Sequence, residues 1–114
     1  MDEKLKDFYE QICSCENKEP WKIFWRVKNL LVNKKIISEH MGLRKQGTII
    51  SIRDNTEATH LERGMIEISF RTKTLIEYIY MKQDKMAFQT KSNDILKITS
   101  AGTGWQTVLE INLS

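Results

Sequence analysis

The chain has 114 residues, of which 40% are apolar and 29% are charged, and it carries a formal net charge of +3. These values exclude a disordered or low-complexity protein and predict a single domain, residues 1–114, with its own hydrophobic core. The apolar runs are only a few residues long, which excludes a membrane-spanning helix. The acidic N-terminus lacks the apolar segment of a secretory signal, so we expect a cytoplasmic protein.

Positive charge is concentrated in one part of the chain. Residues 1–20 carry three basic and six acidic groups, residues 21–50 carry seven basic and one acidic group, and the remainder is balanced. A basic surface of this kind can attract a nucleic acid or a protein with an acidic surface. The basic residues that we select as candidate partner contacts in this region are Lys22, Arg26, Lys34, Lys35, Arg44 and Lys45.

Residues 1–42 are predicted to form the helical part of the domain. A first amphipathic helix is expected over residues 2–13, because apolar side chains recur there at helical spacing, at Leu5, Phe8, Tyr9 and Ile12. Pro20 suits the first turn of a second helix, and the segment WKIFWRVKNLLVN (residues 21–33) has one narrow polar stripe on an otherwise apolar surface. We expect the two helices to pair as an antiparallel hairpin, with the second as the rod on which a sheet packs.

From Gly47 onward the apolar residues alternate with a period of two, which predicts an antiparallel sheet over residues 47–114. Before it, residues 35–41 could form either a short helical turn or a strand. Six strands are expected in the sheet, near residues 48–53, 64–71, 74–82, 85–90, 95–100 and 105–113. Short turns between them predict a meander in which each strand pairs with the next. The predicted fold is therefore α+β, an N-terminal helical hairpin packed on one face of a mostly antiparallel sheet of five to six strands.

The turn positions also predict which strand residues lie opposite one another. Turns at 72–73 and 83–84 would place Ile66 and then Phe88 opposite Ile79. All of these residues fall on one face, which we expect to be buried under the helices. The residues of this buried face are Ile66, Ile68, Phe70, Leu75, Ile79, Met86, Phe88, Ile98, Trp105, Leu109 and Ile111.

Glu77 is the one carboxylate that this register places on the buried face. A buried carboxylate is costly unless it is paired, and Lys28 is the one charged residue in the apolar sector of the second helix. We expect either that Glu77 and Lys28 form an ion pair at the margin of the sheet or that Lys28 extends its amine to solvent. The functional alternative is an acid with a shifted pKa, inside a cavity between the sheet and the helices.

Cys13, Cys15, His40 and His60 are the side chains that a zinc site or a Cys–His nucleophilic pair would use. Their C-x-C spacing with two isolated histidines differs from the paired ligands of structural zinc sites. A disulfide between cysteines two residues apart would be strained, so we expect half-buried free thiols and solvent-facing histidines. The common phosphate-binding and hydrolase motifs are absent from the sequence. We therefore expect no enzymatic activity, no metal and no cofactor.

The opposite face of the sheet is predicted to carry Tyr78 and Tyr80 in line, with Arg71 beside them. This arrangement could be a stacking platform for single-stranded nucleic acid, the aromatic centre of a protein interface, or ordinary cross-strand packing. Together with the basic residues, it predicts a small binding protein that regulates or inhibits a larger macromolecular partner. A phage or plasmid origin would suit that role, and a second copy could cover the same face in a homodimer.

Two short segments resemble parts of winged helix-turn-helix DNA-binding domains. Residues 35–43, KIISEHMGL, resemble the second helix and turn of such a domain. Residues 61–68, LERGMIEI, resemble the end of a recognition helix that leads into the strand of the wing. The resemblance implies sequence-specific DNA binding through a helix between these segments, which is the alternative function.

Overall fold

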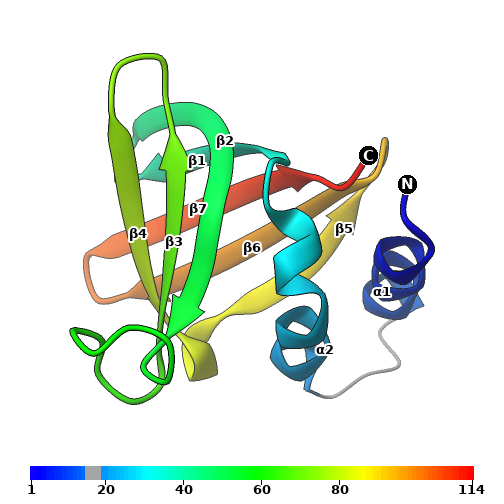
Figure 1. Cartoon of the computed structure of the whole chain (residues 1–114), viewed down its shortest axis with the longest axis horizontal. Coiled ribbons are helices and arrows are strands. Elements are labelled where there is room, and N and C mark those ends of the chain that lie inside the picture. The colour runs from blue at the N-terminus through cyan, green and yellow to red at the C-terminus, as the bar shows by residue number, and fades with distance from the viewer. Residues whose placement is uncertain (15–18) are drawn as a thin grey trace.

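The computed structural model describes residues 1–14 and 19–114, and the fold within them is α+β, as predicted. Helices at the N-terminal side precede one antiparallel sheet of seven strands, rather than the five to six expected (Figure 1). No helix in the described part of the chain is long and apolar enough to cross a bilayer. The elements are α1 (Glu3–Ser14), α2 (Pro20–Val27), the 3₁₀ helices η1 (Lys28–Leu31) and η2 (Gln83–Lys85), and the strands β1 (Lys35–His40), β2 (Leu43–Asp54), β3 (Met65–Arg71), β4 (Ile76–Lys82), β5 (Ala87–Lys91), β6 (Ile95–Gly102) and β7 (Trp105–Asn112).

The two α-helices pack against each other and against β5. Their contact is aromatic, since the ring centroid of Phe8 lies 6.3 Å from that of Phe24, which lies 5.2 Å from that of Phe88 in β5. The Tyr9 hydroxyl donates a hydrogen bond of 2.7 Å to the Lys91 carbonyl and fixes α1 beside the same strand. The buried side chains of α1 are Leu5, Phe8 and Ile12.

The second helix is shorter than the predicted span of residues 21–33. α2 ends at Val27, and η1 continues it as a 3₁₀ helix to Leu31. Residues three apart in a 3₁₀ helix lie on the same side, so Lys28 and Leu31 are both buried. The assumption of a uniform helical period was therefore wrong from Lys28 onward, because the winding tightens there.

Residues 35–43 form β1 and the turn into β2, not the helix that the helix-turn-helix resemblance implied. Met41 and Gly42 have φ of 50° and 84°, which is the backbone of a two-residue turn that matches the twist of a hairpin. His40 therefore lies opposite Leu43. Residues 43–54 continue as the long strand β2, so a strand occupies most of the place expected for a recognition helix.

The order of strands across the sheet is β4–β3–β2–β1–β7–β6–β5, so the predicted meander is interrupted at its centre. β4 and β5 were expected to pair through a turn at 83–84, but they are the two opposite edges. The chain passes from Lys82 in β4 to Ala87 in β5 through η2, a connection that spans at most about 18 Å. The sheet must be strongly coiled for its edges to approach this closely, and Figure 1 shows β2–β4 crossing over β5–β7.

Within each half of the sheet, consecutive strands pair as predicted, but two registers are displaced by two residues. The β3–β4 connection is longer than the predicted turn at 72–73, so Ile79 lies opposite Ile68 rather than Ile66. The β6–β7 register is displaced by the same amount, whereas the predicted β5–β6 register is confirmed. A displacement of two residues leaves every side chain on its predicted face.

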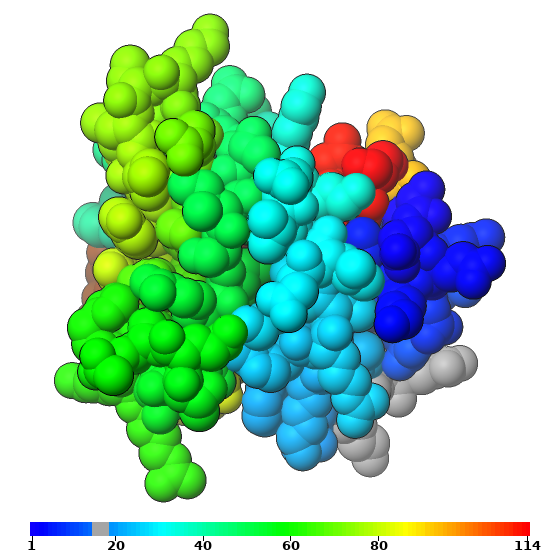
Figure 2. Space-filling view, in the orientation of Figure 1, coloured from blue at the N-terminus to red at the C-terminus, as the bar shows by residue number. Residues whose placement is uncertain are grey.

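The inner face, defined as the sheet face that the helices cover, carries the hydrophobic core. Leu75 and Trp105 were expected within it, but they are exposed because they lie next to turns. Figure 2 shows the helical segment lying directly against β2 and the loop after it. The buried sheet residues of the core are Ile36, Ile49, Ile52, Ile66, Ile68, Phe70, Met81, Leu96, Ile98, Leu109 and Ile111.

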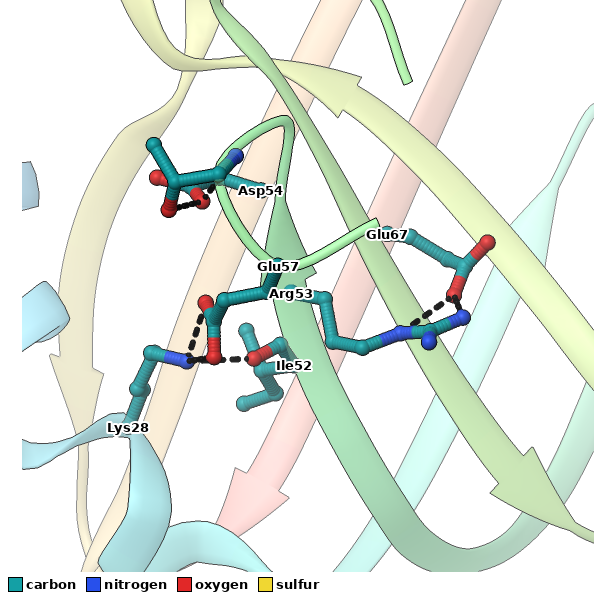
Figure 3. A network of polar contacts seen from close by, with 7 residues as sticks. Lys28, Ile52, Arg53, Asp54, Glu57 and Glu67 are labelled. Atoms are coloured by element: carbon teal, nitrogen blue, oxygen red, sulfur yellow. Dashed lines mark hydrogen bonds and ion pairs between the residues drawn. The ribbon is translucent and has the colours of Figure 1, made fainter. Parts of the chain in front are cut away.

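Lys28 is buried at the boundary between η1 and the sheet, with 6% of its surface exposed. Its ammonium donates hydrogen bonds to the Ile52 carbonyl at 2.7 Å and to the two carboxylate oxygens of Glu57 at 2.7 and 2.8 Å (Figure 3). It also lies 4.4 Å from the ring centroid of Trp25. The predicted alternatives for Lys28, a pair with Glu77 or an amine in solvent, are wrong because η1 turns the side chain toward the loop after β2.

Replacing Lys28 by Met tests this interaction, because Met keeps an apolar chain but leaves the Ile52 carbonyl without the ammonium donor. We expect Lys28→Met to lower the free energy of unfolding by about 1 to 3 kcal/mol. Glu57→Gln should lower it by less than about 1 kcal/mol, since the Glu57 side chain is 41% exposed. Urea unfolding followed by circular dichroism measures both values, and equal losses would contradict the carbonyl bond as the larger contribution.

Candidate functional site

The inner face continues beyond the helices into a pocket of about 390 Å³, which we call the open-end pocket. It lies between β3 and β4 on one side and β1, β2 and β7 on the other. An apolar cavity of about 150 Å³ holds a benzene molecule, so this pocket has room for one large side chain or a small ligand. Its lining residues are Ser38, His40, Leu43, Lys45, Phe70, Glu77, Tyr78, Ile79, Tyr80, Trp105 and Thr107.

Exposed apolar side chains gather at the rim of the open-end pocket. Leu43 and Trp105 follow the β1–β2 and β6–β7 turns directly on the inner face. Tyr78 and Tyr80 belong to the edge strand β4, which borders the pocket, and their side chains lie on the outer side of that edge. All four are among the large apolar side chains that the fold leaves exposed. Apolar surface that gathers in one place and borders polar groups marks interaction sites. The pocket is therefore the candidate functional site.

A glycine leaves room for the tryptophan at this rim. A Cβ atom at position 102 would lie 2.3 Å from Nε1 of Trp105, far inside the distance that two such atoms tolerate. Only glycine therefore lets the indole lie this close to the backbone of β6.

Four polar side chains of the pocket form two pairs. Nδ1 of His40 lies 2.6 Å from Oγ1 of Thr107, and the Lys45 ammonium lies 2.9 Å from the Glu77 carboxylate. Glu77 is on the inner face, as predicted, but its cavity is at the uncovered end rather than between the sheet and the helices. Beside Thr107, the buried hydroxyl of Ser100 has no hydrogen-bond partner among the residues described. Because the two charged groups neutralise each other, the pocket favours an uncharged occupant.

On the outer face of the sheet, Tyr80 lies beside the carboxylate of Glu67, a residue that is 1% exposed. Nη2 of Arg53 donates to Glu67 at 2.6 Å, and Nε2 of His60 lies 2.6 Å from the other oxygen (Figure 3 shows Arg53). Burial acts to raise the pKa of Glu67, but Arg53 and His60 outweigh it and hold that pKa below its ordinary value. Partial desolvation of its hydroxyl, and then the Glu67 carboxylate, raise the pKa of Tyr80. Glu67, rather than Glu77, is the carboxylate that the fold buries.

The predicted partner contacts fall on three separate surfaces. Those that line the open-end pocket are Lys45, Tyr78 and Tyr80. Those on the outer face of the sheet, where they alternate with inner-face residues, are Lys35, Arg44 and Arg71. Those on or after the helices are Lys22, Arg26 and Lys34. The basic residues therefore do not act as one patch, and only the first group belongs to a pocket with an apolar rim.

The cysteines and histidines considered for a zinc site lie on different elements. Cys13 is exposed in α1 rather than half-buried, and Cys15 lies outside the described residues. His40 belongs to the pocket, whereas His60 follows β2 and contacts Glu67. Across residues 1–14 and 19–114, no three His, Cys, Asp or Glu side chains are placed to hold a metal ion.

Sequence reasoning missed Leu43 and Thr107 and misplaced Trp105. An apolar residue directly after Gly42, at a turn that needs glycine, is a signal that could have indicated Leu43 as a surface contact. Trp105 lies on the predicted face, but it was expected in the core and is exposed because it directly follows the β6–β7 turn. Thr107 faces His40 only because β7 pairs with β1, and the sequence carries no local signal for that pairing.

The lowered pKa of Glu67 predicts a pH-dependent stability. Because this pKa is lower in the folded than in the unfolded chain, the ionised carboxylate stabilises the fold at neutral pH, and the contribution is lost as the pH falls through the folded value. We expect Glu67→Gln to lower the free energy of unfolding by about 1 to 3 kcal/mol near pH 7. The difference from wild type should shrink below about pH 4.

Urea unfolding at several pH values measures this difference. Glu39→Gln, at an exposed position of β1, is the matched control and should follow the wild type throughout. A Glu67→Gln difference that stays constant into the acidic range would contradict the assigned role of the carboxylate.

Comparison with known proteins gives no further indication of function. No family model, no curated protein and no solved structure matches the chain. The pocket, its apolar rim and its paired polar groups are therefore the observations from which a function can be inferred.

Proposed function

We propose that this protein is a non-enzymatic binding protein that regulates or inhibits a larger protein partner by taking an apolar side chain of that partner into the open-end pocket. The observation that carries the proposal is an inner-face pocket with two exposed apolar side chains at its rim, Leu43 and Trp105. It is bordered by the edge strand β4, which exposes Tyr78 and Tyr80 on its outer face. Protein interfaces draw most of their energy from a few aromatic or apolar anchors that fill pockets.

The chemistry of the pocket supports an apolar anchor. Tyrosine and tryptophan are the side chains most enriched at interface hot spots, and each large aromatic ring buries about 150 to 250 Å² in contact. The Lys45–Glu77 pair neutralises the charge in the pocket wall, so a charged anchor would lose its hydration without gaining a free counter-charge. A Phe, Leu, Met or Trp side chain is the expected occupant.

The polar groups in the pocket also support a binding role over catalysis. A hydroxyl next to an imidazole, as in Thr107 and His40, has the residue types of a catalytic nucleophile and its general base. Catalysis by such a pair also needs a third group that orients the imidazole. In the part of the chain that the structure describes, no carboxylate is bonded to Nε2 of His40. We therefore assign this pair to the floor of a binding pocket.

A change at Leu43 tests the proposal, because this side chain is 62% exposed and can be altered without disturbing the core. Peptides selected from a random display library on the wild-type protein would provide ligands for the measurement. We expect Leu43→Glu to weaken their binding by about tenfold or more, since a charge at the rim opposes burial of an apolar anchor. Fluorescence anisotropy with labelled peptides measures the affinities.

Met41→Glu is the matched control for this experiment. Met41 is 67% exposed, belongs to the same turn, and does not line the pocket. Its substitution introduces the same charge two residues away and should leave affinity within about twofold of wild type. Equal losses of affinity for the two variants, or selected peptides whose affinity is unchanged by Leu43→Glu, would refute the pocket as the binding site.

A second candidate function, binding to a nucleic acid, is favoured by a groove of about 570 Å³ on the outer face. Lys35, Arg71 and Lys73 line it, and none of them has an ion-pair partner among the described residues. Cations without partners on a sheet surface are suited to contact phosphates. This candidate does not use the open-end pocket, so the two can be separated by mutation.

The nucleic-acid candidate predicts binding to random duplex DNA that weakens steeply with salt. Each phosphate contact adds about 0.9 to the slope of log affinity against log salt, so the double variant Lys35→Gln, Arg71→Gln should reduce the slope by about two. Lys22→Gln with Arg26→Gln removes the same charge from α2 and should leave the slope unchanged. Filter binding measures the slopes, and no binding even at low salt would remove this candidate.

A further inference from the structure

The two edges of the sheet differ in how they are covered. At the β5 edge, α1 packs alongside the strand, and the Tyr9 hydroxyl donates a hydrogen bond to the Lys91 carbonyl. At the β4 edge, no further strand follows within the described part of the chain. An uncovered edge presents a row of backbone donors and acceptors that another strand can pair with.

The register shows which residues of β4 direct these groups outward. In an antiparallel pair, the residues that bond to the neighbouring strand alternate along the chain. The bonds at the two ends of the β3–β4 hairpin involve Leu75 and Gln83, and the ladder between them has no register shift. Residues of odd number therefore face β3, and the residues whose N–H and C=O groups point away from the sheet are Ile76, Tyr78, Tyr80 and Lys82.

The side chains of these same residues leave the β4 edge open to pairing with another strand. Ile76, Tyr78 and Tyr80 are exposed and apolar. Natural edge strands are usually protected by charges, prolines or bulges that block pairing. The charged residue in the middle of β4, Glu77, instead turns inward and pairs with Lys45. The edge therefore has the composition of a strand in contact with another strand.

We propose that an extended segment of the partner protein adds to β4 as a further strand and directs its apolar side chain into the open-end pocket. This inference rests on the proposed function and specifies the conformation of the bound segment. Only another extended backbone matches the row of outward N–H and C=O groups, as in other cases of strand addition. A helical segment would leave these groups without partners.

The pocket lies where such a strand would need it. Residues that lie opposite each other on neighbouring strands point to the same face. A partner residue opposite Glu77 or Ile79 would therefore point to the inner face, where both of these residues line the pocket. The partner residues before and after it would lie beside Tyr78 and Tyr80 on the outer face. The predicted recognition pattern is thus an extended segment with an apolar anchor and alternating contacts.

Amide hydrogen exchange tests the proposal residue by residue. The probe is a synthetic peptide of about twelve residues, taken from the display selection and sensitive to Leu43→Glu. We expect the amides of Ile76, Tyr78 and Tyr80 to exchange about tenfold more slowly, or slower still, when the peptide is bound. The amides of Glu77 and Ile79 face β3 and should change far less. Two-dimensional NMR of the full chain resolves these positions.

N-methylation of the probe peptide provides an independent measurement. Methyl groups on alternate backbone nitrogens should each weaken binding by about tenfold, because they block bonds to β4. Methyl groups on the intervening nitrogens should leave the affinity within about twofold, and these peptides are the matched controls. A loss without alternation would overturn strand addition.

Each remaining outcome also decides the question. A peptide that requires Leu43 but leaves exchange at Tyr78 and Tyr80 unchanged would overturn strand addition while leaving the pocket as the binding site. A selection that yields no peptide sensitive to Leu43→Glu would overturn both proposals. Protection at Tyr78 that rises with protein concentration without peptide, together with a dimer in sedimentation, would show that a second copy occupies the edge and would overturn the proposal.

Discussion

The fold depends on β1 pairing on both of its sides. One ladder to β2 and another to β7 join the two halves of the sheet into a single layer. Along β1, successive inner-face positions pass from the core to the candidate site, because Ile36 is fully buried, Ser38 is nearly so, and His40 reaches the open-end pocket. The strand that contributes to the hydrophobic core at one end thus lines the pocket at the other.

The end of β2 is fixed from both faces of the sheet. On the helical side, Lys28 bonds to the Ile52 carbonyl and to Glu57, whereas on the outer side Arg53 bonds to Glu67 (Figure 3). The loop after β2 contributes to both groups, since it carries Glu57 and also His60, which contacts Glu67. Charged groups removed from water in this way favour one arrangement of the loop, because any other would leave a buried charge without its partner. Tyr80, next to Glu67, is held by the same network.

The sequence was sufficient to predict the faces of the strands but not their partners. Alternation with a period of two assigns Ile68 and Glu77 to one face whatever the turn length, so a register error of two residues did no harm. The β1–β7 pairing has no local signal, because it joins segments that are distant in the chain. The candidate site was consequently predicted only in part: Tyr78, Tyr80 and Lys45 were selected from aromatic and charge patterns, whereas the contribution of Trp105 depends on how distant turns meet.

The distance along the chain between β1 and β7 also affects how the molecule folds during its synthesis. Ile36 lies opposite Ile111, while all other ladders join strands that are consecutive in sequence. Pairings between distant segments form slowly, because the chain must lose much of its freedom before the contact stabilises it. While β7 is still inside the ribosome, β1 of the nascent chain has one side unpaired. Chaperones that shield exposed strands would bind the chain at that stage.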